Sequence, residues 1–414
     1  MNDRFVNCHT HIFNVKCAPD RFIGLPIARF ISERKLMVKG MLKVMRLVGS
    51  SSEAAVEKWA NFLDIGSQKS QADVFDLLQS NYSFGPMAYV ALTLNMDHMG
   101  AGKASLNFQS QLAEIRQLKL SHLDNLIPFI SVDPRAGNPD ELLQLVKIHL
   151  ERYGFGGIKL YPPLGFYPFD PRLEKIYAYA QEYQIPVLTH TSQGGIFYQG
   201  DELTLDHLQP LTFGNVRARR VNLDGTESSE SIDYSENVRR VRRFLRKTWG
   251  IGKRNKEFKL HFSDPMNYLI VLKRFPQLKL CMAHFGGDDQ IEKYVTDVDQ
   301  RSVASNNWHM IVCDILKKYP NTYADISYAL WKKEIWSRFK DCIRGPLAEG
   351  GDISHQILFG TDYFMTIQEK EETRLVNDFR NVLDRTEFNR IAVDNPARFL
   401  SNHIPFAQGI NQPN

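Results

Sequence analysis

The sequence predicts an α/β fold: a (β/α)8 TIM barrel of eight parallel strands, with helical insertions after the first strand and between the fifth and sixth. Eight short apolar runs recur along the chain, and segments with helical spacing separate most of them. Such alternation implies parallel pairing, and eight strand–helix units are enough to close a barrel. No GxGxxG motif follows any of the runs, which disfavours an open, doubly wound sheet.

The predicted strands are short runs of apolar residues bounded by polar or turn-forming residues. In chain order they cover residues 4–11, 88–96, 126–132, 156–161, 185–190, 278–284, 321–327 and 356–362. Two longer stretches, residues 13–86 and 191–264, break this rhythm. We interpret both as insertions into a single barrel domain that spans residues 1–414, because (β/α)8 barrels often reach this length.

Apolar residues recur every three or four positions between the predicted strands, which is typical of helices packed on a core. Ser70 is placed to cap a helix that runs to Leu78, and Pro139 is placed to open a helix that runs to Leu150. The other predicted helices cover residues 52–63, 173–183, 235–249, 268–275 and 308–319.

Composition favours a cytoplasmic protein. The five cysteines are scattered without a CxxC motif, as expected for reduced thiols rather than a disulfide framework. The first strand begins by Arg4, which leaves no room for a cleaved leader, and no apolar stretch approaches the length of a membrane span. The net charge of +4 is small, so nucleic acid is not expected as a partner.

Polar side chains stand at the carboxyl ends of five predicted strands, where (β/α)8 barrels hold their catalytic groups. Side chains alternate along a strand, so His9 and His11 project to the same side and can converge on one cation. Buried histidine or aspartate is costly unless it is paired, so packing alone explains this set poorly. The residues concerned are His9, His11, Lys159, His190, His284 and Asp362.

On these motifs the chain resembles the amidohydrolase superfamily. It is most similar to the amidohydrolase-related branch that contains aminocarboxymuconate-semialdehyde decarboxylase and 2-pyrone-4,6-dicarboxylate lactonase. The anchors follow the family's order from residue 8 to residue 400. The matching segments cover residues 8–11, 157–162, 187–190, 275–287, 360–362 and 395–400.

The resemblance implies a metal site. Its ligands are His9, His11, His190 and Asp362, and His284 lies beside the metal-bound water as a catalytic acid, base or carbonyl polariser. Asp362 then has a second role, accepting the water's proton and returning it to the leaving group. A mixed histidine and carboxylate site suits zinc, and also manganese, iron or cobalt.

Lys159 leaves two arrangements open. In relatives with two metal ions a carboxylated lysine on the fourth strand bridges them; in a one-metal site Lys159 is a free cation that binds a substrate carboxylate or pairs with Asp362. We favour one ion, because the branch is largely mononuclear and a free lysine is the simpler state. Asp325, at the end of the seventh predicted strand, could bind substrate, but structural hydrogen bonding is the interpretation that we favour.

The function that follows is metal-dependent hydrolysis of a carbonyl compound, such as a lactone, amide or ester, on a small, carboxylate-bearing substrate. One alternative keeps the metal but makes the enzyme a non-oxidative decarboxylase or a hydratase of an unsaturated or aromatic acid. A second alternative is a barrel that has lost catalysis and acts as a binding protein through a basic insertion.

That basic insertion covers residues 215–260, with thirteen lysines or arginines against six acidic residues. We interpret it chiefly as a solvated face, and alternatively as a surface that attracts an anionic substrate. A second basic stretch, residues 29–48, has helical apolar spacing and is expected to be a lid or a helix at a homo-oligomer interface.

Overall fold

The computed structural model describes residues 4–21, 62, 64–84, 87–200, 259–296 and 307–403, with the backbone of residues 220–221 and 227–228. Its main sheet contains a strand at each of the eight predicted places. These are β1 (Phe5–Thr10), β2 (Met87–Leu92), β3 (Leu126–Val132), β4 (Gly157–Leu160), β5 (Val187–His190), β8 (Leu280–Ala283), β9 (Thr322–Asp325) and β10 (Ile357–Leu358). They pair in that order, and every pair is parallel.

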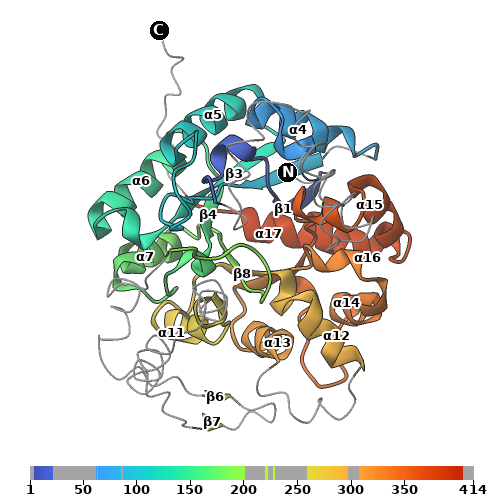
Figure 1. Ribbon diagram of the computed structural model, residues 1–414. Coiled ribbons are helices and arrows are strands. Elements are labelled where there is room, and N and C mark those ends of the chain that lie inside the picture. Colours follow the sequence, from blue (N-terminus) through green and yellow to red (C-terminus); the bar gives the residue numbers. More distant parts are fainter. Residues whose placement is uncertain are drawn as a thin grey trace, which may run out of the picture.

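Backbone hydrogen bonds between β1 and the segment after β10 close the sheet into a barrel. Cys8 N–H donates to the carbonyl of Phe359 over 2.8 Å, and Asp362 N–H donates to the carbonyl of His9 over 2.9 Å. Thr10 and Tyr363 form a parallel bridge beyond them. The predicted (β/α)8 fold is therefore confirmed, and Figure 1 shows the helices as a ring around the strands.

The helices lie where their sequence signals place them. Ser70 caps α4 through a capping box with Asp73, and Asn138 caps α6, which has Pro139 in its first turn. The α-helices of the described ranges are α4 (Gln71–Ser80), α5 (Phe108–Ser121), α6 (Pro139–Glu151), α7 (Glu174–Glu182), α11 (Asn267–Arg274), α12 (Asp288–Thr296), α13 (Trp308–Lys318), α14 (Trp336–Arg344), α15 (Glu372–Arg380), α16 (Arg385–Asn389) and α17 (Asn395–Leu400). None of the helices in the described ranges is both long and apolar enough to traverse a bilayer.

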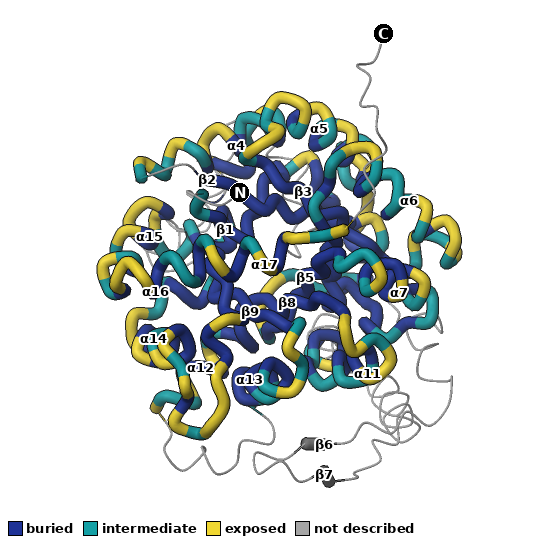
Figure 2. Tube along the Cα trace, turned by 180° about the vertical axis from the view of Figure 1, so that it is seen from behind, coloured by how far each residue is buried: buried dark blue, intermediate teal, exposed yellow. Residues whose placement is uncertain are grey.

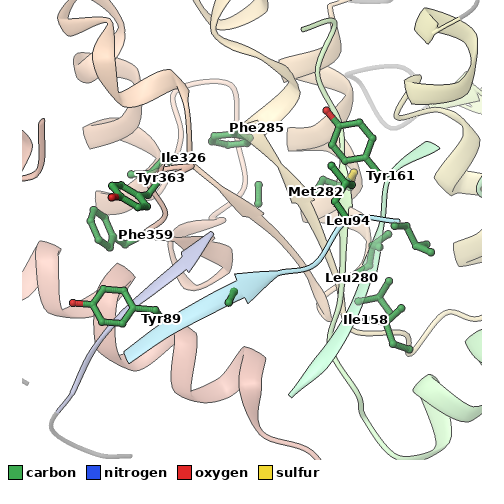
Figure 3. Packing of buried hydrophobic residues seen from close by; sticks show 14 of the residues in the cluster. Tyr89, Leu94, Ile158, Tyr161, Leu280, Met282, Phe285, Ile326, Phe359 and Tyr363 are labelled. Carbon is green, nitrogen blue, oxygen red and sulfur yellow. The ribbon is translucent and has the colours of Figure 1, made fainter. Parts of the chain in front are cut away.

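Two apolar layers support the barrel. The larger layer lies between strands and helices, and Figure 3 shows part of it. The smaller layer fills the barrel with alternate strand residues such as Phe129 and Tyr323, against which Phe399 of α17 packs. In Figure 2 the strands are dark and the outward faces of the helices are light, as burial on both sides of a parallel sheet requires.

Parts of the predicted insertions lie outside the described residues. This holds for the predicted helix at 235–249, for most of that at 52–63, for the basic stretch 29–48 and for nearly all of 215–260. The cysteine prediction can be checked: all five are buried and free of disulfides.

Candidate metal centre

A break in the regular ladder of β1 sets the direction in which the first two candidate side chains point. Val6 and Cys8 belong to the apolar layer inside the barrel, yet their near neighbours His9 and His11 also face inward. The pairing of β1 with β2 shifts register between Asn7 and Thr10. Because a bulge adds one residue to the strand, the side chains that face inward after it are those of His9 and His11 and not that of Thr10. The predicted common face of His9 and His11 is confirmed, with their ring centroids 5.4 Å apart.

Asp362 joins these two histidines. Its Oδ1 atom lies 3.3 Å from Nε2 of His9 and 3.2 Å from Nε2 of His11. All three side chains are buried, and their potential ligand atoms lie within 4.8 Å of one another. Asp362 has a φ of 63°, a left-handed backbone conformation that costs energy for a residue other than glycine and is frequent at functional sites.

Hydrogen bonds on the far side of each ring fix which nitrogen faces Asp362. Nδ1–H of His9 donates to Oδ2 of Asp325 over 2.9 Å, and Nδ1–H of His11 donates to the carbonyl of Leu92 over 3.1 Å. Each Nε2 therefore presents a lone pair, which is how metal-binding histidines are usually oriented. His9 Nε2 and Asp362 Oδ1 have no hydrogen-bond partner in the described part of the chain. Two buried acceptors facing each other in this way fit a cation between them.

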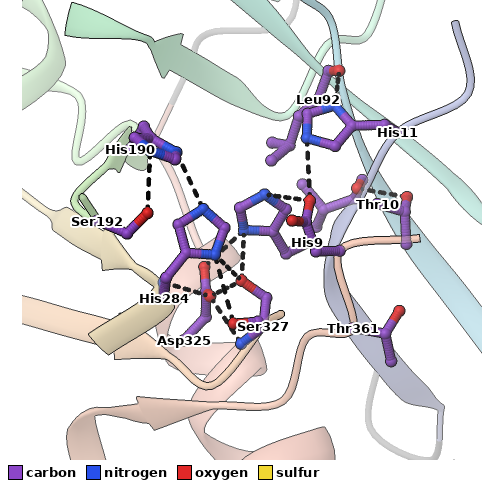
Figure 4. A network of polar contacts seen from close by, with 12 residues as sticks. His9, Thr10, His11, Leu92, His190, Ser192, His284, Asp325, Ser327 and Thr361 are labelled. Atoms are coloured by element: carbon purple, nitrogen blue, oxygen red, sulfur yellow. Dashed lines mark hydrogen bonds and ion pairs between the residues drawn. The ribbon is translucent and has the colours of Figure 1, made fainter. Parts of the chain in front are cut away.

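His190 and His284 form the other half of the centre. Nδ1 of His190 lies 3.0 Å from Nε2 of His284, and the ring of Tyr161 stacks on His190 with centroids 4.4 Å apart. Nε2 of His190 contacts Oγ of Ser192 at 3.1 Å. Figure 4 shows the four histidines beside one another. His190 thus lies next to His284 and outside the tighter group of His9, His11 and Asp362.

Asp325 and Ser327 connect the two halves from below. Asp325 Oδ1 accepts the backbone N–H of His284 over 3.0 Å and that of Ser327 over 3.1 Å. Ser327 Oγ lies 3.0 Å from Nδ1 of His9 and 2.9 Å from Nδ1 of His284. The favoured structural hydrogen bonding of Asp325 is confirmed, and Ser327 is a neighbour of both histidines that the sequence analysis missed. Alternation along the predicted strand at 321–327 would put Asp325 and Ser327 on one side and was the available signal, although β9 itself ends at Asp325.

Burial and neighbouring charge set the protonation of these groups. Burial lowers the pKa of His284 to about 4, and burial together with His284 lowers the pKa of His190 well below its ordinary value. Burial alone would raise the pKa values of Asp362 and Asp325, but His9 outweighs it and holds both below their usual range. Ionised carboxylates, together with the neutral imidazoles of His190 and His284, are protonation states in which such residues bind a divalent metal.

Lys159 stands on β4 inside the barrel and is fully buried. Burial lowers its pKa to about 8, against the opposing charges of Asp325 and Asp362. Its Nζ has no hydrogen-bond partner among the described residues, so they hold no hydrogen-bonded pair between Lys159 and Asp362. The ring of Tyr161 lies near it, with Nζ 5.5 Å from the ring centroid.

A cavity of about 330 Å³ opens onto the centre. His11, His190, His284 and Asp362 line its floor, so four of the predicted residues reach it. Its walls are largely apolar and aromatic. The wall residues include Phe13, Phe62, Leu94, Tyr161, Ile196, Tyr328 and Met365. Phe13, Ile196 and Tyr328 stand in loops, where no periodic pattern marked them in the sequence.

A closed (β/α)8 barrel with buried histidines and an aspartate at the carboxyl ends of its strands, open to a cavity, has the architecture of a barrel enzyme. The family model described as amidohydrolase matches residues 6–401. The chain belongs to the amidohydrolase family and is an enzyme, which confirms the predicted resemblance and sets aside the non-catalytic alternative.

Comparison with curated proteins finds no match. Among solved structures, the chain is similar to an uncharacterised TIM-barrel protein from Bordetella bronchiseptica, with 14% identity and a TM-score of 0.49 over 96% of this chain and 98% of that one. A 5-carboxyvanillate decarboxylase from Novosphingobium aromaticivorans, solved with manganese and 4-hydroxy-3-methoxy-5-nitrobenzoic acid, has 11% identity, a TM-score of 0.49 and 96% coverage of both chains.

A 2,6-dihydroxybenzoate decarboxylase from Rhizobium has 13% identity and a TM-score of 0.43, over 79% of this chain and 86% of that one. At such identities and TM-scores, the reaction of this chain has to be argued from its own site.

Proposed function

We propose that the protein is a metal-dependent hydrolase that binds one divalent cation, zinc in the first place, through His9, His11, His190 and Asp362. The observation that carries the proposal is the pair of buried acceptors, His9 Nε2 and Asp362 Oδ1, which face each other without a hydrogen-bond partner in the described ranges. The proposal requires His190 to turn its Nδ1 from His284 toward the cation.

A divalent cation bound there would lower the pKa of water to about 7 and polarise a carbonyl oxygen. The side chains supply the remaining steps. Asp362 is an ionised carboxylate at the cavity floor, placed to take a proton from the attacking water and to pass it to the leaving group. His284 also reaches the cavity, where its Nε2, once protonated, can donate a hydrogen bond to the carbonyl oxygen as negative charge develops on that oxygen.

The substrate that we propose is a small molecule with an apolar body and an ester, lactone or amide carbonyl. A cavity of about 330 Å³ has room for a compound of this kind, and its aromatic walls suit a flat one. We keep the anionic substrate as part of the proposal, because Lys159 is a buried cation without a hydrogen-bond partner in the described chain. We also propose that the chain forms a single barrel domain and that it assembles into a homo-oligomer.

Non-oxidative decarboxylation is the second candidate. The observation that favours it is the apolar wall, which would strip water from a substrate carboxylate and so promote loss of CO₂. The same ligands serve both reactions, so the choice of reaction has to be tested on the products.

The test has two parts. Metal analysis of the purified protein should find one equivalent of a divalent metal. Two equivalents together with a carboxylated Lys159 would replace the one-ion proposal. Absence of bound metal would overturn both the hydrolase and the decarboxylase proposal. Lactones and esters, hydroxybenzoate-type acids and muconate-type acids are then assayed in water labelled with oxygen-18. Label in the product carboxyl group supports hydrolysis. Release of CO₂ without incorporation of label identifies a decarboxylase.

A further inference from the structure

We propose that Asn7 is a positioning residue for the metal centre: its side-chain amide holds together the two backbone segments that carry His9 and Asp362. The inference rests on the proposed function, since it concerns how tightly the ligands of that centre are held. Asn7 itself is not among the residues that line the cavity.

The seam between β1 and the segment after β10 is the place where the barrel closes. On its other edge β1 pairs with β2, and the register shift after Asn7 interrupts that ladder. Oδ1 of Asn7 accepts the backbone N–H of His9 and the backbone N–H of Thr361, each over 3.2 Å. One side-chain oxygen thus satisfies a donor on each side of the seam.

The amide nitrogen of Asn7 fixes the orientation of that oxygen. Nδ2 donates to the hydroxyl of Tyr82 and to Oγ1 of Thr361, each over 2.8 Å. Both hydroxyls have then accepted a hydrogen bond, and each donates its own proton to Oε1 of Glu372. All four hydrogen-bonding positions of the amide are used, so a flipped amide would place donors against donors.

The two segments held by Asn7 lead directly into metal ligands. His9 follows Asn7 by two residues, and Asp362 follows Thr361 by one. Asn7 is fully buried, so no water can take over its hydrogen bonds at no cost. Without the amide, two buried N–H groups would lose their acceptor. The segments of His9 and Asp362 would then lack the side-chain hydrogen bonds of Asn7 that hold the distance between His9 Nε2 and Asp362 Oδ1.

The test is the affinity of the Asn7→Ala variant for Zn²⁺, measured against a competing chelator on protein that has been stripped of metal and shown to be folded. We expect affinity to fall about 10–100-fold, the range typical for loss of groups that orient metal ligands. Tyr82→Phe removes one acceptor of the amide and leaves Asn7 in place, so it should weaken Zn²⁺ binding less. If Asn7→Ala does not fold, the Zn²⁺ affinity of Tyr82→Phe tests the inference in its place.

The matched control is Asn395→Ala. Asn395 is also a fully buried amide that bridges two segments, donating to the carbonyls of Ser354 and Ile357 at the start of β10, away from the centre. It should lower thermal stability and leave Zn²⁺ affinity unchanged. The inference is overturned if Asn7→Ala, or Tyr82→Phe in its place, binds Zn²⁺ as wild type does, or if Asn395→Ala weakens binding equally. Failure of wild type to bind metal would refute the proposed function instead.

Discussion

Nδ1 of His9 donates a hydrogen bond to Oδ2 of Asp325 over 2.9 Å, between two fully buried side chains that stand 316 positions apart in the chain. Burial disfavours a charged His9, but Asp325 outweighs that effect and raises the pKa of the ring. The same contact keeps the proton of the neutral ring on Nδ1. It therefore leaves Nε2 as the atom that faces Asp362.

Asp325→Asn is expected to weaken metal binding about 10–100-fold with little change of shape, because an amide nitrogen can present a hydrogen to Nδ1 and favour the wrong tautomer of His9. Metal content after dialysis against chelator measures the effect. Retention of wild-type affinity would show that Asp325 does not set the tautomer. Asp133→Asn, which changes a buried carboxylate bound to Arg135, is the control.

His190→Ala and His284→Ala should separate binding from catalysis. We expect His190→Ala to lose its metal, since one of four ligands is removed. His284→Ala should retain the metal and lose about 10²–10⁴-fold in kcat, the usual contribution of a general acid or base. Metal content and steady-state rates are measured on the same preparations. The opposite pattern would exchange the roles of the two histidines.

Gly360→Ala should disturb His9 directly. A Cβ atom added at Gly360 would lie 2.8 Å from Cβ of His9, closer than side chains pack, so one of the two segments has to move. We expect a loss of about 1–3 kcal/mol in the free energy of unfolding together with weaker metal binding.

Gly350→Ala is the matched control for that variant. Its added Cβ meets no atom within 4 Å, while a φ of +91° makes it a strained substitution. It should lower stability and leave metal affinity unchanged. Equal metal affinity in Gly360→Ala and Gly350→Ala would argue against close packing of Gly360 on His9.

Glu372 predicts a pH dependence of stability. Burial raises its pKa to about 7, above the value of an exposed glutamate, so the folded protein binds a proton more tightly than the unfolded chain. Its contribution to stability is therefore present below about pH 4 and is lost as pH rises toward 7. Glu372→Gln removes this titration, so stability relative to wild type should improve by on the order of 2 kcal/mol between pH 4 and pH 8.

Denaturant unfolding at both pH values measures that difference. Because the same buffers are used for both proteins, titration of other groups cancels in the comparison. A pH-independent difference between Glu372→Gln and wild type would mean that Glu372 does not change protonation in this range.

Local sequence was sufficient to predict the strands and the ends that carry chemistry. Alternation within a strand depends only on backbone geometry, so the spacing of His9 and His11 was enough to predict that they share a face. The positions of Lys159, His190, His284 and Asp362 followed from the strand ends, because parallel strands in a barrel bring those ends to one face.

Only the tertiary structure decided how those side chains meet. The bulge after Asn7, the hydrogen bond from His9 to Asp325, the place of Ser327 and the aromatic cavity walls all depend on contacts between segments far apart in the chain. The pairing of His190 with His284 is of the same kind. The order of residues along the chain determines which side chains stand at the carboxyl ends of the strands. Closure of the barrel determines the distances between these side chains, because packing and hydrogen bonds act between neighbours in space.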